Sequence, residues 1–155
     1  MPRKTALDAL ERCRRNGAWS SQTLSALIER RKLDARDAAL CSRLFLGTLQ
    51  NLYYLDFCID RFAKGKLEPK LRDILRLGAY QILFMDRIPN RAAVNESVRL
   101  CRDVGLTRAT GLVNAVLRKM ADAPAPQDSI PERGVSAWQQ EHCFSDTFRT
   151  GRDSR

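Results

Sequence analysis

The 155-residue sequence has a single histidine, His142, and five cysteines that lie far apart without a C-x-x-C pair. A structural zinc site needs four clustered cysteine or histidine ligands, so we expect no metal site. The odd number of cysteines favours reduced thiols. Four of them lie on apolar faces of predicted helices and are expected to be buried as small side chains, namely Cys13, Cys41, Cys58 and Cys101. No apolar run approaches the roughly 18–20 residues of a membrane span. The first residues, Met-Pro-Arg-Lys-Thr, precede no hydrophobic segment of the kind found in a secretory signal. These absences predict a cytoplasmic protein with no membrane contact.

The motifs of common catalytic and nucleotide-binding sites are also missing. The sequence contains no Gly-rich phosphate loop, no G-x-G-x-x-G after a strand and no H-E-x-x-H. His142 and Cys143 are neighbours, but adjacent side chains of an extended chain point apart, so they do not form a base and a nucleophile. The carboxylates lie mostly among basic residues at helical spacing, which suits surface ion pairs. We therefore expect no catalytic residue and no bound cofactor, and a binding module rather than an enzyme.

Both the charge balance and the apolar periodicity of the sequence change near residue 121. Residues 1–121 hold 23 basic and 12 acidic side chains, a balance of +11, whereas residues 122–155 hold 4 and 6, a balance of −2. The second segment opens with Asp-Ala-Pro-Ala-Pro-Gln, which is typical of a linker, and shows no sustained apolar period. We predict a domain over residues 1–121, followed by a linker and a disordered tail over residues 122–155 that is not native to the fold of this domain.

Every strong apolar period in the predicted domain is helical, and no segment alternates long enough to form a strand. The clearest stripe runs from Ala109 to Met120 and includes Leu112, with Thr107 able to cap it. The helix that begins at Pro69 is apolar on most sides and is predicted to be central. Gly78 in its middle costs about 1 kcal/mol relative to alanine, which a close approach of another helix would offset. Further helices are predicted up to Asn16-Gly17, from Ser20-Ser21, from Asp34, over Leu52–Phe62 and over Arg91–Asp103 with Asn90 as cap. The sequence therefore predicts an all-α compact bundle of about seven helices.

Two basic regions make nucleic acid the expected partner, because cationic surfaces attract phosphates. The candidate RNA-binding residues are Arg3, Lys4, Arg12, Arg14 and Arg15 near the N-terminus, and Arg118 and Lys119 at the end of the last helix. An alternative is a solvated face that only keeps the bundle soluble. On that interpretation the first helix is crossed by i, i+4 ion pairs, namely Lys4–Asp8, Asp8–Arg12 and Glu11–Arg15. Trp19, Tyr53 and Tyr54 are candidates for base stacking or for packing.

Three motifs carry a family resemblance. They are Leu-Arg-Leu-Gly-Ala-Tyr-Gln-Ile-Leu (75–83), Ile-Pro-Asn-Arg-Ala-Ala-Val-Asn-Glu-Ser-Val (88–98) and Val-Asn-Ala-Val-Leu-Arg (113–118). In this order and spacing, from about Pro2 to Met120, the chain resembles the NusB-like RNA-binding domain. It is most similar to the form that opens the RsmB (Sun/Fmu) 16S rRNA cytosine-C5 methyltransferases. Asn95 and Asn114 lie in these motifs, and we expect buried amides there to brace neighbouring helices.

The resemblance implies a module that holds 16S rRNA for a catalytic domain. The family's enzymes continue into a Rossmann-like domain that binds S-adenosylmethionine and supplies the attacking cysteines, so that cofactor is expected only for the missing domain. Cys143 does not lie in the family's Pro-Cys context, and we expect a truncated or frame-shifted product that is inactive alone. The alternative is a free-standing NusB-type transcription antitermination factor, for which the resemblance implies boxA RNA and ribosomal protein S10 as partners.

Overall fold

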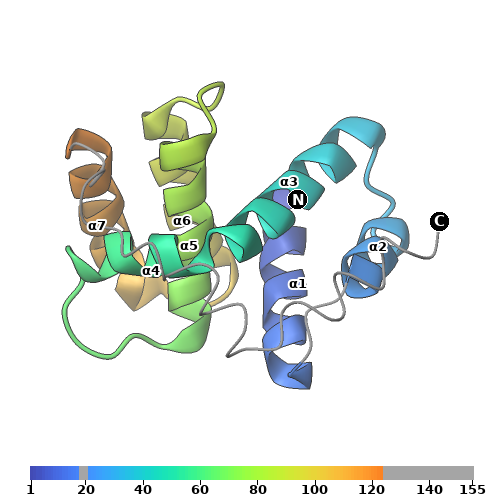
Figure 1. The fold of residues 1–155 in the computed structure, drawn as a ribbon, viewed down its shortest axis with the longest axis horizontal. Helices are drawn as coiled ribbons and strands as arrows, with labels where there is room; N and C mark the ends of the chain where they lie inside the picture. Colours follow the sequence, from blue (N-terminus) through green and yellow to red (C-terminus); the bar gives the residue numbers. More distant parts are fainter. Residues whose placement is uncertain (18–20, 124–155) are drawn as a thin grey trace.

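The computed structural model describes residues 1–17 and 21–123, and these residues form helices joined by short connections without any strand. The prediction of an all-α bundle is confirmed. The central helix is α5 (Pro69–Phe84), which packs against α1, α3, α4, α6 and α7. In Figure 1 α1 and α2 lie on one side of α5 and α7 lies on the other, while α6 overlaps α5 in this view. The remaining helices are α1 (Pro2–Asn16), α2 (Ser21–Arg30), α3 (Ala35–Gln50), α4 (Leu52–Asp60), α6 (Asn90–Asp103), the 3₁₀ turn η1 (Thr107–Ala109) and α7 (Thr110–Asp122). The helix α7 extends one residue into the predicted tail, to Asp122, and residues 124–155 of that tail lie outside the described residues.

The expected close approach at Gly78 is present. A methyl group added at Gly78 would lie 2.6 Å from Oγ of Ser97 on α6 and 2.7 Å from Cδ1 of Leu117 on α7. Both distances are shorter than van der Waals contact, so the three helices meet at this glycine. A second close approach, which the sequence analysis missed, occurs at Gly47 on α3, where an added methyl group would overlap the ring of Tyr80. Gly47 therefore lets α3 pack closely against α5, and Gly78 lets α6 and α7 do the same.

The helix starts agree with the sequence at some positions and not at others. Asp34 caps α3, since its carboxylate accepts a hydrogen bond of 2.8 Å from the backbone N–H of Asp37. The expected caps at Asn90 and Thr107 are wrong. Asn90 is already the first helical residue, after Pro89, and makes no capping bond. Thr107 opens the 3₁₀ turn instead, and its carbonyl accepts a hydrogen bond from the hydroxyl of Thr110.

The expectation that Leu112 faces the core is also wrong, because its side chain is among the exposed large apolar ones. The buried face of α7 is therefore narrower than the apolar residues in its sequence suggest.

Four cysteines, Cys13, Cys41, Cys58 and Cys101, are buried as the sequence predicts, and Cys143 lies outside the described residues. Burial raises the pKa of the Cys41 thiol to about 11, and it also raises the pKa of Cys101. A thiol with a raised pKa remains protonated, and so unreactive, at neutral pH.

We expect slow alkylation of these thiols in the folded protein. In a Cys143→Ser background, iodoacetamide at pH 8 should label all four within minutes in denaturant and only slowly without it. Because the folded state holds the Cys41 proton more tightly, the free energy of unfolding should fall as the pH rises from about 9 to about 11. Mass spectrometry and urea titrations measure these two effects. Rapid labelling of Cys41 in the folded protein would contradict its burial.

Candidate nucleic-acid interface

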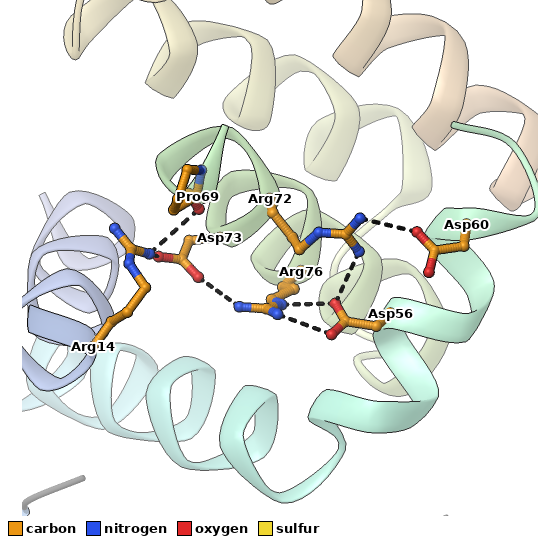
Figure 2. Close-up of polar contacts among 7 residues, drawn as sticks. All are labelled: Arg14, Asp56, Asp60, Pro69, Arg72, Asp73 and Arg76. Carbon is orange, nitrogen blue, oxygen red and sulfur yellow. Dashed lines mark hydrogen bonds and ion pairs between the residues drawn. The ribbon is translucent and has the colours of Figure 1, made fainter. Parts of the chain in front are cut away.

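An internal network of ion pairs joins α1 to α5 and α5 to α4 (Figure 2). Arg14 on α1 pairs with Asp73 on α5, and it also donates a hydrogen bond of 3.3 Å to the Pro69 carbonyl. The other side of Asp73 accepts a hydrogen bond of 2.9 Å from Arg76. Two further carboxylates on α4 complete the network, with Asp56 bound to Arg76 at 2.8 Å and to Arg72 at 3.3 Å, and Asp60 bound to Arg72 at 3.0 Å. Arg14, a candidate for RNA contact, is therefore engaged inside the protein.

Asp73 is the most buried member of this network, with 1% of its surface exposed. Burial raises the pKa of its carboxyl above the ordinary value, and the opposing charges of Arg76 and Arg14 only partly offset this effect. The carboxylate needs both arginines to compensate for its lost hydration. The network thus fixes the end of α1 against the central helix.

The other candidates on α1 differ in how freely they face the solvent. Arg3 donates a hydrogen bond of 2.9 Å from Nε to the buried side chain of Gln81. Arg12 is exposed, Lys4 is half-buried, and Arg15 is exposed but forms an ion pair of 3.1 Å with Glu11. Arg12 and Lys4 are therefore the cations of α1 with the fewest internal contacts.

Of the three predicted i, i+4 pairs, Glu11–Arg15 is confirmed and the two pairs of Asp8 are wrong. Asp8 forms its ion pair with Arg31, which follows α2 and also donates a hydrogen bond of 3.1 Å to Thr5. A tertiary contact between α1 and the end of α2 has replaced the local pairs. Lys4 and Arg12 are left without a carboxylate partner among the described residues.

The N-terminus of α1 meets α6 at a small hollow of about 120 Å³. Arg3 and Lys4 line it from α1, and Arg99 lines it from α6, together with the carboxylates of Glu96 and Asp103. The hollow adds Arg99 to the two cations that the sequence analysis selected. The basic region of α1 therefore continues onto α6.

A longer groove lies between α6 and α7, and we call it the α6–α7 groove. It consists of two adjoining hollows of about 330 Å³ and 420 Å³ that share Asn95. Arg118, a sequence candidate, lines the first hollow opposite Arg91, and Arg102 lines the second. The complete lining is Asn90, Arg91, Val94, Asn95, Val98, Arg102, Thr110, Gly111, Asn114, Arg118, Ala121 and Asp122. Lys119, the last candidate, is exposed on α7 but is not among the residues that line the groove.

The expectation that Asn95 and Asn114 brace neighbouring helices is wrong. Asn95 is exposed and Asn114 is half-buried. Neither side chain has a hydrogen-bond partner in the described part of the chain. The helices meet instead through small and apolar side chains, such as Gly78 against Leu117. The amides therefore do not brace the bundle and are available to a ligand.

Three basic residues of the interface, Arg91, Arg99 and Arg102, were missed by the sequence analysis. All three are exposed on α6, where with Asn95 they recur at intervals of three or four residues. This spacing forms a polar stripe along one side of a helix and was visible in the sequence. It was overlooked because the three arginines do not cluster along the chain. Folding places them beside the termini of α1 and α7.

Of the three aromatic candidates for base stacking, the structure shows Tyr54 engaged in packing. Tyr53 and Tyr54 are half-buried, and Tyr54 contacts Phe84 edge-on with ring centroids 5.8 Å apart. Trp19 lies outside the described residues. Residues 1–17 and 21–123 bring together no group of three or more potential metal ligands. No helix within these ranges is long and apolar enough to cross a membrane.

Comparisons with known proteins agree with the motifs. The model of the NusB family matches residues 1–122. The probable ribosomal RNA small subunit methyltransferase B of Bacillus subtilis is 33% identical, over 92% of this chain and 35% of that protein. The protein of the same name from Synechocystis is 27% identical, over 93% of this chain and 33% of that protein. The transcription antitermination protein NusB of Desulforudis audaxviator is 31% identical, over 79% of this chain and 91% of that protein.

The chain thus spans about a third of the length of the two methyltransferases. A match of 92% of this chain is longer than residues 1–122, so these two alignments also include part of the segment after residue 122. The methyltransferase and antitermination relatives share the region that forms the helical bundle here.

Proposed function

Because the chain belongs to the NusB family, we propose that it is an RNA-binding helical module like the NusB region of a ribosomal RNA small subunit methyltransferase. Its ligand on this proposal is 16S rRNA. The observation that carries the proposal is the line of cations from the N-terminus of α1 across α6 to the end of α7. Lys4 is half-buried on α1, Arg91, Arg99, Arg102 and Arg118 are exposed on α6 and α7, and none of these five forms an ion pair with a carboxylate of the described residues.

Unpaired surface arginines favour phosphate binding over simple solubility. A helix face that is merely solvated usually carries charges of alternating sign that form ion pairs. Such an ion pair occurs elsewhere in the molecule, between Glu11 and Arg15. The cations of the α6–α7 groove have Asp122 as the single carboxylate among the lining residues. Three arginines against one carboxylate make the concave surface of the groove positive, which favours polyanions.

Salt dependence tests this proposal. For the 155-residue chain with fragments of 16S rRNA, the logarithm of the binding constant should fall linearly with the logarithm of salt concentration, with a slope of about −0.7 per phosphate contact. The double variant Arg91→Gln/Arg118→Gln should reduce the magnitude of this slope by about 1.4, since two contacts are lost. Fluorescence anisotropy at several salt concentrations measures both slopes.

The matched control removes the same charge elsewhere. Arg36 and Arg43 are exposed on α3, outside the residues that line the groove. Arg36→Gln/Arg43→Gln should leave the slope close to that of the wild type. A wild-type slope near zero would contradict RNA binding, and equal losses in the two double variants would contradict this location.

On this proposal the protein acts in the cytoplasm and supplies binding rather than chemistry. S-adenosylmethionine and the cysteines that attack the base would belong to sequence outside the region that the chain matches. We expect no methyl transfer from the 155-residue chain alone. Residues Arg3 and Arg14 are reassigned to the support of α1, because their side chains contact Gln81 and Asp73.

A second candidate function comes from the antitermination relatives, one of which is 31% identical over 79% of this chain. The chain spans 91% of the antitermination protein from Desulforudis audaxviator, against about a third of each methyltransferase. An antitermination factor would bind boxA RNA and ribosomal protein S10. Titration calorimetry with S10 separates the two functions, since tight binding of S10 without binding of 16S rRNA fragments would favour the antitermination factor.

A further inference from the structure

The walls of the α6–α7 groove carry more positive than negative charge. Arg91, Arg102 and Arg118 line the groove, and Asp122 is the single carboxylate among its lining residues. None of the three arginines forms an ion pair with a carboxylate of the described residues. A ligand that neutralises this surface therefore has to bring about two negative charges.

The chain leaves the helical bundle at this groove. Ala121 and Asp122, the last residues of α7, line the hollow of about 330 Å³ together with Arg91 and Arg118. Ala123 then has an extended backbone, with φ −85° and ψ 142°, so the helix ends there. Whatever follows Ala123 therefore starts beside two of the three arginines.

The sequence after Ala123 supplies the missing charge. Residues 124–132, which we call the acidic segment, read Pro-Ala-Pro-Gln-Asp-Ser-Ile-Pro-Glu and lie outside the described residues. They contain two carboxylates, Asp128 and Glu132, and no lysine, arginine or histidine. Residues 1–121, in contrast, have a balance of +11. The acidic segment thus carries the two negative charges that the groove lacks.

The wall of the groove on α6 places apolar side chains between its cations. Val94, which is buried, and Val98, which is half-buried, line the groove between Arg91 and Arg102. The eleven residues from Arg91 to Arg102 correspond to about 16 Å of helix. Along its length this wall therefore presents a cation, an apolar stretch and a second cation.

The acidic segment has the complementary order. Alternate side chains of an extended chain share one side, so Asp128, Ile130 and Glu132 would face the same surface. Four residues of extended chain cover about 13 Å, which is close to the separation of the two cations on α6. A carboxylate, an apolar side chain and a second carboxylate therefore match the groove in both order and spacing.

Chain length permits this contact, and the covalent link favours it. Six residues of extended chain cover up to about 20 Å, so Asp128 can reach either end of the groove from Asp122. A short linker gives an effective concentration of about 1 mM. A contact with a dissociation constant of about 0.1 mM would then be occupied about nine-tenths of the time.

We propose that the acidic segment of this chain docks in the α6–α7 groove, with Asp128 and Glu132 paired to its arginines and Ile130 against Val94 and Val98. The docked segment covers the cations that the proposed function assigns to RNA. It therefore acts as an internal competitor of RNA, and this consequence rests on the proposed function, whereas the docking itself does not.

Trypsin tests the docking in the full chain. Arg133 directly follows the acidic segment and is the only lysine or arginine between residues 120 and 148, and Arg149 comes next. A protease cleaves mainly the undocked fraction. Cleavage after Arg133, relative to cleavage after Arg149, should be about tenfold slower in the wild type than in Arg91→Gln/Arg118→Gln. Mass spectrometry of the digest measures both rates.

The controls keep the cleaved sequence the same, so the intrinsic preferences of trypsin cancel. Arg36→Gln/Arg43→Gln removes two exposed cations of α3 and should retain the protection. Salt at 1 M should abolish it, since the screening length falls to about 3 Å. Tenfold dilution should leave it unchanged, because the contact lies within one chain. Protection that is lost on dilution would assign the groove to a second copy and would overturn the proposal.

A second measurement tests the competition. Asp128→Asn/Glu132→Gln should bind fragments of 16S rRNA about tenfold more tightly than the wild type, since the apparent dissociation constant is the intrinsic one divided by the open fraction. Glu141→Gln/Asp146→Asn removes two carboxylates beyond the acidic segment and should keep the wild-type affinity. Fluorescence anisotropy measures the three affinities.

The outcomes separate this inference from the proposed function. Equal relative cleavage after Arg133 in the wild type and in Arg91→Gln/Arg118→Gln would overturn the docking and leave the proposed function standing. Equal gains in RNA affinity in the two carboxylate variants would overturn the competition. Protection of Arg133 without RNA binding by any variant would support the docking and overturn the proposed function.

Discussion

Replacement of Asp73 by alanine is expected to lower the free energy of unfolding by about 3–5 kcal/mol, the usual cost of breaking a buried ion pair from one side. Asp73 is almost fully buried and joins Arg14 on α1 to Arg76 on α5 (Figure 2). Arg76 keeps Asp56 as a partner in the variant. Arg14 keeps only the Pro69 carbonyl, so α1 loses its charged anchor on the central helix.

Urea titration followed by circular dichroism measures this loss. The matched control is Asp60→Ala, since Asp60 belongs to the same network but its side chain is 57% exposed. Exposed ion pairs contribute about 0–1 kcal/mol, so the control should change stability by no more than that. If the two variants were equally stable, Asp73 would not be an anchor of the fold.

Replacement of Gly78 by leucine is expected to destabilise the protein by about 3 kcal/mol or more, at the upper end for overpacked cores. The new side chain would overlap Oγ of Ser97 and Cδ1 of Leu117 and would force α6 and α7 away from α5. Ser97 cannot easily give way, because its hydroxyl donates a hydrogen bond of 2.8 Å to the Ala93 carbonyl. Displacement of these helices would also deform the α6–α7 groove.

A second glycine distinguishes packing from helix propensity. Gly111 lies in α7 with open space around it, so Gly111→Ala should stabilise the protein by up to about 1 kcal/mol. Gly78→Ala gains the same propensity but should still be destabilising, because even a methyl group overlaps its neighbours. Thermal unfolding of the three variants would show this order. A stabilising Gly78→Ala would contradict the close contact of the three helices.

The assignment of candidate residues changes most on α1. Arg14 was selected because it lies in a basic cluster along the chain, and the structure places it against a buried carboxylate. Arg91, Arg99 and Arg102 are dispersed in sequence but exposed on one helix, where they meet Lys4 and Arg118 across neighbouring elements. Clustering along the chain was therefore a poorer guide to the interface than helical spacing.

The sequence by itself determined the helical class, most helix positions, the burial of four cysteines and the need for a close contact at Gly78. These features depend on local periodicity and on the intrinsic properties of single residues, which act within one or two helical turns. The family motifs likewise lie within single helices or their connections, so they were recognisable without a fold.

Only the tertiary structure decided which cations remain available for a ligand and where the motif amides point. Asp8 could pair with Lys4 or Arg12 along the helix but contacts Arg31, which is distant in sequence. Asn95 and Asn114 lie on helices with strong apolar stripes, yet the packing of α6 against α7 leaves both lining a groove. Such outcomes depend on how helices dock, because ion pairs and grooves form between elements that the chain brings together only on folding.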